Sequence, residues 1–220
     1  MKKVCVLGSN GFIGKNLMKL RWINWVGVCR QELDLLNQEK VYKFFEKNTF
    51  DVVIHCSAKL HKDSMFENVL MFENVVRSFK GKIIYFSSGA ALLGNPPTDQ
   101  YGLSKWIIDR RIESIPNVYC LRIWGCYGPS ELPTRFSAVC KREHHVKIVK
   151  DRYFDFVDVK DVRKVVDQYI SGKRVDKEVD LVYPEVKLLS QWADFFGATY
   201  EIEDSSEFGE SYVSQRIKLM

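Results

Sequence analysis

The chain has 220 residues, of which 46% are hydrophobic and 28% charged, and its formal net charge is +5. This length and composition allow one substantial core with a small second lobe. No basic stripe with interleaved aromatic residues occurs, so nucleic-acid binding is not expected. No apolar run approaches the roughly 18 residues of a membrane span, and the run before Gly8 is too short for a signal peptide.

The six cysteines form no CxxC pair, and most lie in apolar, strand-like runs. A free thiol in such a run behaves as a small hydrophobe, so the cysteines predict a reduced, cytoplasmic protein without a disulfide framework. His144 and His145 have no third ligand at a useful spacing, so no metal site is predicted.

Strand-like and helix-like segments alternate from the N-terminus. Short apolar runs predict strands at residues 3–7, 25–30, 51–55, 82–87 and 117–122. Helical spacing of apolar residues predicts helices at 12–21, 37–47, 64–79 and 99–114. Continuous apolar strands separated by helices are typical of a parallel sheet covered on both faces.

The pattern is less regular after Pro129. The predicted elements are a helix at 135–143, strands at 146–150 and 153–157, a helix at 159–171 ending at Gly172, a strand at 178–182, and a helix at 191–196 with Ser190 as its N-cap. From Thr199 the tail is acidic. The prediction is an α/β protein with a doubly wound parallel sheet, a Rossmann fold, and a small C-terminal α+β lobe. Residues 1–130 form the dinucleotide-binding domain, and residues 131–220 form a reduced substrate lobe interleaved with it.

The sequence GSNGFIG at residues 8–14 joins the first strand to the first helix. Gly8 permits a tight turn, Gly11 lets the backbone approach a pyrophosphate, and Gly14 lets the helix pack close to the strand. The spacing is GxxGxxG, and glycines at such turns are common, so the flanking strand and helix strengthen the prediction of a dinucleotide site.

The end of the second strand favours NADP over NAD. An NAD site usually has Asp or Glu there to bind the ribose 2′-hydroxyl. This chain has Arg30 instead, which can pair with a 2′-phosphate, although an ordinary surface arginine at a strand end is the alternative.

The sequence YGLSK at residues 101–105 opens a predicted helix. Residues four apart lie on one face of a helix, so Lys105 is expected beside Tyr101. A nearby ammonium stabilises a phenolate, which suits Tyr101 to exchange a proton with a carbonyl or alcohol oxygen while a hydride moves. The alternative is a helix with a half-buried tyrosine and an exposed lysine.

These two motifs and several others resemble the extended short-chain dehydrogenase/reductases, the NAD(P)-dependent epimerase/dehydratase family that acts on nucleotide sugars. The resemblance runs from Val4 to about Val182, and residues 32–59 are most similar to the 4-keto reductases and epimerase-reductases, the group of GDP-fucose synthase and dTDP-4-dehydrorhamnose reductase. The further motifs are DL at 34–35, FDVVIHCSA at 50–58, NV at 68–69, IYFSS at 84–88, YGP at 127–129 and DFV at 155–157.

The resemblance implies roles for named residues. Tyr101 and Lys105 are the expected catalytic pair, with Ser88, or less favourably Ser87, polarising the substrate carbonyl. The expected cofactor-binding residues are Gly8, Asn10, Gly11, Phe12, Ile13, Gly14, Arg30, Asp34, Leu35, Ser57, Ala58, Lys59, Asn68, Tyr101 and Lys105. Arg152 and Ser87 are expected at the substrate, and Arg122 is either a second phosphate contact or a buried structural charge.

The chain departs from the family pattern at the catalytic hydroxyl. Gly89 stands where a Ser or Thr is expected, and Ser88 comes one residue earlier. Adjacent strand residues face opposite ways, so Ser88 fits only if the strand ends or bulges there. Only eleven residues separate Gly89 from Tyr101, which shortens a substrate-facing loop. Phe154 replaces a family arginine, and Arg152, two residues earlier, faces the same way on an extended strand.

The predicted function is hydride transfer to a 4-keto carbon of a nucleotide-linked sugar, with NADP as the cofactor, or less favourably NAD. The alternatives are a catalytically impaired NAD(P)-binding sensor or subunit, and a related enzyme for a non-sugar carbonyl. The family also implies a homodimer through the helices at 64–79 and 99–114, with Phe72, Trp106 and Ile107 either at that interface or in the core.

Overall fold

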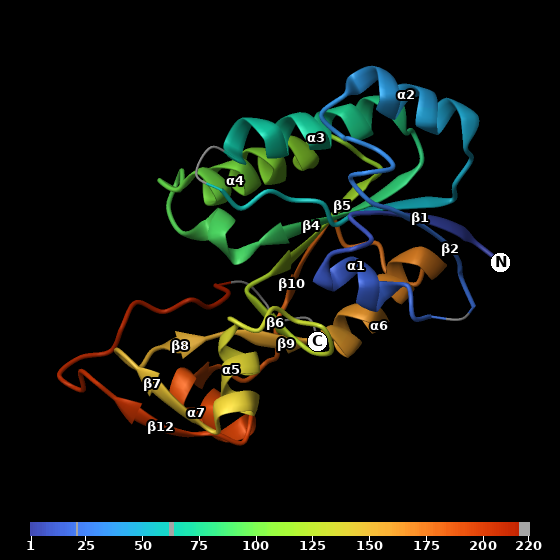
Figure 1. Cartoon of the computed structure of the whole chain (residues 1–220). Coiled ribbons are helices and arrows are strands. Elements are labelled where there is room, and N and C mark those ends of the chain that lie inside the picture. Colours follow the sequence, from blue (N-terminus) through green and yellow to red (C-terminus); the bar gives the residue numbers. More distant parts are fainter. Residues whose placement is uncertain (21, 62–63, 216–220) are drawn as a thin grey trace. The chain divides into compact units, whose positions relative to one another are not determined.

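The fold is described from a computed structural model, over residues 1–20, 22–61 and 64–215. Its central feature is a six-stranded sheet in the order β10-β5-β4-β3-β1-β2 (Figure 1). The strands are β1 (Lys3–Leu7), β2 (Asn24–Val28), β3 (Val52–His55), β4 (Lys82–Ser88), β5 (Val118–Ile123) and β10 (Glu178–Leu181). β1 runs parallel to β2 and β3, and β3 runs parallel to β4. The predicted parallel Rossmann-like sheet is confirmed.

Helices cover both faces of this sheet, as Figure 1 shows. One face carries α2 (Gln38–Lys47), α3 (Ser64–Ser78) and α4 (Gln100–Glu113), and the other carries α1 (Phe12–Leu17) and α6 (Val159–Ser171). A continuous core of buried aliphatic and aromatic side chains lies under α2, α3 and α4 and includes Val53, Phe72, Val75 and Ile108. Burial on both faces explains why the strands are apolar throughout.

The carboxyl ends of β1 to β4 lie along one edge of the sheet. Leu7 pairs with Val28 on one side and with His55 on the other, and His55 pairs with Tyr85. The loops that follow these strands therefore share one edge, where ligands of open α/β sheets bind.

Most predicted elements of this part agree with the structure within two residues, and α1 is the exception. The helix ends at Leu17, where the hydrogen-bond pattern tightens to three-residue turns at Lys19 and Leu20. Its predicted end at residue 21 lies outside the described residues.

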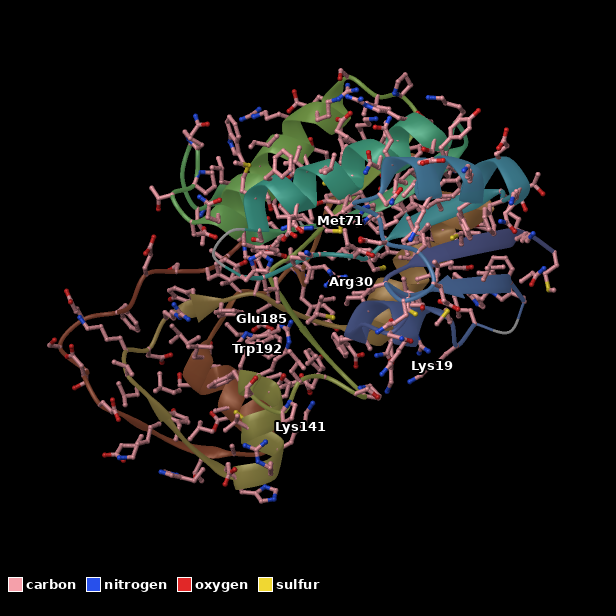
Figure 2. The ribbon with its side chains drawn as sticks, turned by 45° about the horizontal axis from the view of Figure 1, so that its top comes forward. Lys19, Arg30, Met71, Lys141, Glu185 and Trp192 are labelled. Atoms are coloured by element: carbon pink, nitrogen blue, oxygen red, sulfur yellow. The ribbon has the colours of Figure 1, made fainter. Side chains whose placement is uncertain are left out.

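Apart from α6 and β10, the later elements of the described residues form three two-stranded sheets and two helices. β6 (Gly125–Tyr127) pairs with β9 (Phe156–Asp158), β7 (His145–Ile148) with β12 (Thr199–Ile202), and β8 (Tyr153–Phe154) with β11 (Lys187–Leu188). The helices α5 (Phe136–Glu143) and α7 (Leu189–Phe195) contribute to a core around Trp192 (Figure 2).

Two predictions in this region are wrong in detail. The strand predicted at 153–157 is divided at Asp155, because β8 pairs antiparallel with β11 whereas β9 pairs parallel with β6. Ser190 is not the N-cap of its helix: α7 begins at Leu189, and the Ser190 hydroxyl donates to Asp151 Oδ2 at 2.5 Å.

The chain divides into two compact units. Unit 1 comprises Met1–Arg122 and Arg163–Val179, and unit 2 comprises Ile123–Val162 and the described residues from Asp180 onward. The sequence placed the boundary near residue 130 and expected the second lobe to be interleaved with the first; in the structure, residues 163–179 group with the sheet unit, where α6 covers one face.

No helix in the described ranges is long and apolar enough to cross a bilayer.

Candidate active site

The glycine turn between β1 and α1 leaves no room for a side chain at Gly8 or Gly14. Gly8 has a φ of +85°, and a Cβ there would lie 2.9 Å from the backbone nitrogen of Ser57. A Cβ on Gly14 would lie 2.5 Å from the carbonyl oxygen of Gly8. The turn therefore requires glycine at both positions, as the sequence predicted for a dinucleotide site.

A cavity of about 340 Å³ opens beside this turn, entirely within unit 1. Arg30, which follows β2, and Met71 on α3 both contribute to its lining (Figure 2). The predicted cofactor residues that line it are Gly8, Asn10, Gly11, Arg30, Asp34, Leu35, Ser57, Ala58 and Lys59. The other predicted cofactor residues do not line it; these are Phe12, Ile13, Gly14, Asn68, Tyr101 and Lys105.

The chemistry of this cavity fits a dinucleotide. Gly8 and Gly11 of the glycine turn line the cavity, and so does the exposed cation Arg30. Asp34 stands at the same edge and accepts a hydrogen bond from Leu36 N at 3.1 Å. Glycines without side chains suit close approach of a phosphate to the backbone, and an arginine suits a further phosphate group.

Asn68 does not line the cavity but is hydrogen-bonded to Lys59, which does. The residue is buried; its side-chain oxygen accepts from Lys59 N at 2.8 Å, and its amide donates to Lys59 O at 3.0 Å. The Lys59 ammonium pairs with Glu67 on α3. Asn68 thus fixes the shape of the loop.

The N-terminus of α4 lies against the short 3-10 helix η1 (Gly89–Leu92), which follows β4. Asp99 caps α4 and accepts from Gly102 N at 2.7 Å. A Cβ on Gly102 would lie 2.8 Å from the carbonyl oxygen of Ala90. This close approach brings the half-buried Tyr101 to the carboxyl end of β4.

Lys105 is buried, with a fractional exposure of only 2%, so the alternative of an exposed lysine does not apply. Its Nζ donates to Tyr85 Oη at 2.7 Å and to the Phe86 carbonyl oxygen at 2.9 Å. The same Nζ lies 5.6 Å from the centre of the Tyr101 ring. Burial lowers the pKa of Lys105 from 10.5 to about 8, while the carboxylate of Asp109 opposes that fall.

Ser88, the residue predicted to polarise the substrate carbonyl, is the last residue of β4 and still has an extended backbone, with φ −141° and ψ 150°. The strand ends at Ser88, which becomes the N-cap of η1 and accepts from Ala90 N at 3.2 Å. The strict alternation of facing directions therefore stops before Gly89. Ser87 is also buried, and its Oγ has no hydrogen-bond partner among the described residues.

The two arginines considered for phosphate binding have different environments. Arg122 is buried in unit 1 and donates to Asp109 Oδ2 at 2.8 Å and to Glu178 Oε2 at 3.1 Å, which makes it a structural charge. Arg152 belongs to unit 2 and lines a groove of about 350 Å³ together with Lys147 and Lys150.

Sequence reasoning missed the partner of Lys105. Tyr85 lies in an apolar strand, and nothing in the local pattern marks it as a polar contact of a residue twenty positions later. Several cavity-lining residues were also missed because their types carry no chemical signature; these are Leu7, Val28, Cys29, Gln31, Leu33, Cys56 and Met71. Across the described ranges, no group of three or more His, Cys, Asp or Glu side chains is arranged to hold a metal ion.

A parallel sheet with a glycine turn, an adjoining cavity and a Tyr–Lys helix defines an α/β protein of the dinucleotide-binding class. The sequence model of the NAD dependent epimerase/dehydratase family matches residues 4–180. The chain belongs to this family, which confirms the resemblance found in the sequence. No curated protein matches the chain significantly in sequence.

Solved structures share the fold at low sequence identity. The dTDP-4-dehydrorhamnose reductase of Bacillus anthracis, solved with NADP, is 18% identical with a TM-score of 0.79, over 94% of this chain and 86% of its own. A GDP-L-fucose synthetase of Naegleria fowleri is 15% identical with a TM-score of 0.80, over 96% and 83%. A GDP-mannoheptose C4 reductase of Campylobacter jejuni, also with NADP bound, is 17% identical with a TM-score of 0.74, over 95% and 90%.

Proposed function

We propose that the protein is an NADP(H)-dependent reductase or epimerase for a nucleotide-linked sugar, with reduction at a 4-keto carbon. The observation that carries the proposal is that Lys105 is buried beside Tyr101 in the unit that also forms the glycine-turn cavity. Burying an ammonium costs free energy unless hydrogen-bond acceptors or opposite charges compensate it. Buried titratable groups are often found at functional sites.

Within this proposal, Tyr101 delivers a proton to the carbonyl oxygen of the substrate. Lys105 supplies a fixed positive charge next to the Tyr101 ring and so stabilises the phenolate that remains. The cofactor, when bound, supplies the hydride. Ser88 donates a hydrogen bond to the same carbonyl oxygen, and Ser87, with its buried and unpartnered hydroxyl, is the alternative donor.

The choice of NADP rests on Arg30. It lines the cavity after β2, where an acidic residue would favour NAD, and it provides a cation for a 2′-phosphate. The Bacillus, Naegleria and Campylobacter enzymes include structures solved with NADP, which supports the same choice.

A nucleotide sugar is the proposed substrate because several solved structures of this fold are nucleotide-sugar enzymes by name. Arg152 and the neighbouring lysines of its groove are suited to bind a diphosphate, since they place positive charge beside apolar surface. The six free cysteines fit a reducing compartment, and the proposal retains a cytoplasmic location.

The proposal includes a homodimer through α3 and α4. Trp106 and Ile107 are half-buried and remain candidate contacts. Phe72 is excluded from that interface, because it is 1% exposed and belongs to the core.

The test is NADPH oxidation in the presence of a panel of 4-keto nucleotide sugars, monitored as loss of NADPH absorbance. We expect turnover by the wild type and a loss of about 100-fold or more in Tyr101→Phe, the range for removal of a positioned general acid. NADPH binding, measured separately by fluorescence, should be retained in Tyr101→Phe.

The matched control is Tyr42→Phe, an exposed tyrosine on α2, which should keep full turnover. Tight NADPH binding by the wild type without turnover of any sugar would overturn the enzymatic proposal in favour of a cofactor-binding sensor or subunit.

A further inference from the structure

The ammonium of Lys105 is held by a second tyrosine. Its Nζ lies 2.7 Å from Tyr85 Oη, and it lies 4.5 Å from the centre of the Tyr85 ring against 5.6 Å for Tyr101. The backbone carbonyl of Phe86 is the other acceptor, at 2.9 Å. Both acceptors come from β4, the strand that ends at Ser88.

Tyr85 itself is fixed by packing. It is 1% exposed, and its ring meets Phe72 edge-on at 5.1 Å and the His55 ring at 5.5 Å. Burial, followed by the negative charge of Asp109, raises the pKa of Tyr85 well above 10, so its phenol is neutral. Burial also lowers the pKa of His55 to about 3, so the ring beside Tyr85 is uncharged.

We propose that Tyr85 is a positioning residue for Lys105, whose buried phenol oxygen fixes the ammonium within reach of the Tyr101 ring. The catalytic role of Tyr85 rests on the proposed function, whereas its hydrogen bond with Lys105 does not.

The hydrogen-bond donors of the Lys105 ammonium show why its contact with Tyr85 affects its orientation. An ammonium has three N–H donors, and two are used by Tyr85 and Phe86. With these two bonds made, one donor is left for a bound ligand. Without Tyr85, that donor would no longer have a fixed direction.

The phenol also offsets part of the cost of burying the charge. The titratable groups around Lys105 come from three strands and its own helix; they are His55 and Cys56 on or after β3, Tyr85 on β4, Cys120 on β5, and Tyr101 and Asp109 on α4. Asp109 is the carboxyl group among them, and it forms an ion pair with Arg122. The Tyr85 oxygen is therefore the closest side-chain partner of the ammonium.

The experiment is an NMR titration of cofactor-free protein with labelled lysine side chains, in which Lys105→Met assigns the Lys105 signal. We expect a midpoint near pH 8 in the wild type and about one pH unit lower in Tyr85→Phe, the size expected for losing one hydrogen bond to a charged group. The alkaline limb of the turnover profile should move in the same direction.

The matched control is Tyr169→Phe. Tyr169 is buried in the same unit and donates to the Asp176 carbonyl oxygen at 2.8 Å, so the variant loses one buried phenol bond on α6, at the other face of the sheet from α4. Its Lys105 midpoint should match the wild type. An unchanged midpoint in a folded Tyr85→Phe would overturn the assignment.

If Tyr85→Phe does not fold, the wild-type protein still tests the assignment of Tyr85. A through-space NMR contact between the Lys105 ε-methylene and the Tyr85 ring is expected, and its absence would also overturn the assignment. If the wild type does not bind NADPH, the proposed function fails, whereas the titration still tests Tyr85.

Discussion

The side-chain amide of Asn68 donates to Ser104 Oγ at 3.1 Å and so joins α3 to α4. The same amide group holds the backbone of Lys59, whose loop lines the cavity. Ser104 Oγ in turn donates to the carbonyl oxygen of Tyr101 at 2.7 Å. One buried network thus connects the cavity loop with the helix turn that carries Tyr101.

Asn68→Ala should weaken NADPH binding by about 10-fold. It leaves the peptide groups of Lys59 without their buried partner, which costs ~1–3 kcal/mol and lets the loop move. Fluorescence titration with NADPH measures the change. Asn48→Ala is the control, since Asn48 also bonds a backbone carbonyl, that of Phe44, but lies outside the cavity lining. If Asn68→Ala and Asn48→Ala bound NADPH with equal affinity, the Asn68 network would not support the cavity loop.

Arg30→Ala should reverse part of the cofactor preference. Loss of a charge-assisted contact to a 2′-phosphate weakens NADPH binding by roughly 10-fold to 100-fold, whereas NADH has no such phosphate and should bind as before. The measurement is the ratio of the two dissociation constants. Arg110→Ala, which removes an exposed arginine of α4, should leave that ratio unchanged. A parallel loss for both cofactors would mean that Arg30 does not read the phosphate.

Adding one methyl group at Gly14 and adding one at Gly11 should have different effects on the stability of the glycine turn. Gly14→Ala places a Cβ 2.5 Å from Gly8 O, so the backbone must shift, and we expect a loss of ~1–3 kcal/mol in the free energy of unfolding. Gly11 has a φ of −74°, and a Cβ there meets Gly8 O at 3.3 Å, so Gly11→Ala should cost about 1 kcal/mol or less.

Gly11 lines the cavity and Gly14 does not, so Gly11→Ala should nevertheless impair NADPH binding. Denaturant unfolding and NADPH titration on both variants make the comparison. If Gly11→Ala binds NADPH normally, the cofactor does not approach the backbone at this turn.

The sequence predicted the sheet unit well because its signals are local. Strands buried on both faces are apolar throughout, amphipathic helices repeat with a fixed period, and Gly8 and Gly14 occupy positions that exclude side chains. Asn37 and Asp99 cap their helices one residue before the observed starts, which accounts for the small differences at those boundaries.

Features that depend on tertiary pairing could not be predicted. The division of the strand at Asp155 follows from which strands β8 and β9 pair with, and no residue there breaks the extended pattern. The hydrogen bond between Tyr85 and Lys105 joins a strand that looks apolar to a helix twenty residues later. The end of β4 at Ser88 is a further such feature, because the residue pattern of the strand alone does not indicate where it stops.

The burial of Lys105 should be visible in the pH dependence of stability. Its pKa is about 8 in the folded protein and near its ordinary 10.5 when unfolded. Between these values the unfolded chain binds the proton that the native state has lost, so this group makes the free energy of unfolding rise with pH. Below pH 8 both states are protonated and the contribution is constant and unfavourable.

Lys105→Met removes this contribution, so the wild type should gain stability relative to the variant by about 3 kcal/mol between pH 8 and pH 10.5. Other groups that titrate in this range are common to both proteins and cancel in the difference. Denaturant unfolding at several pH values measures it, and Lys80→Met, which removes an exposed lysine, should show no such trend. A difference that stays flat up to pH 10.5 would mean that Lys105 is not desolvated in solution, and it would remove the electrostatic basis of its action on Tyr101.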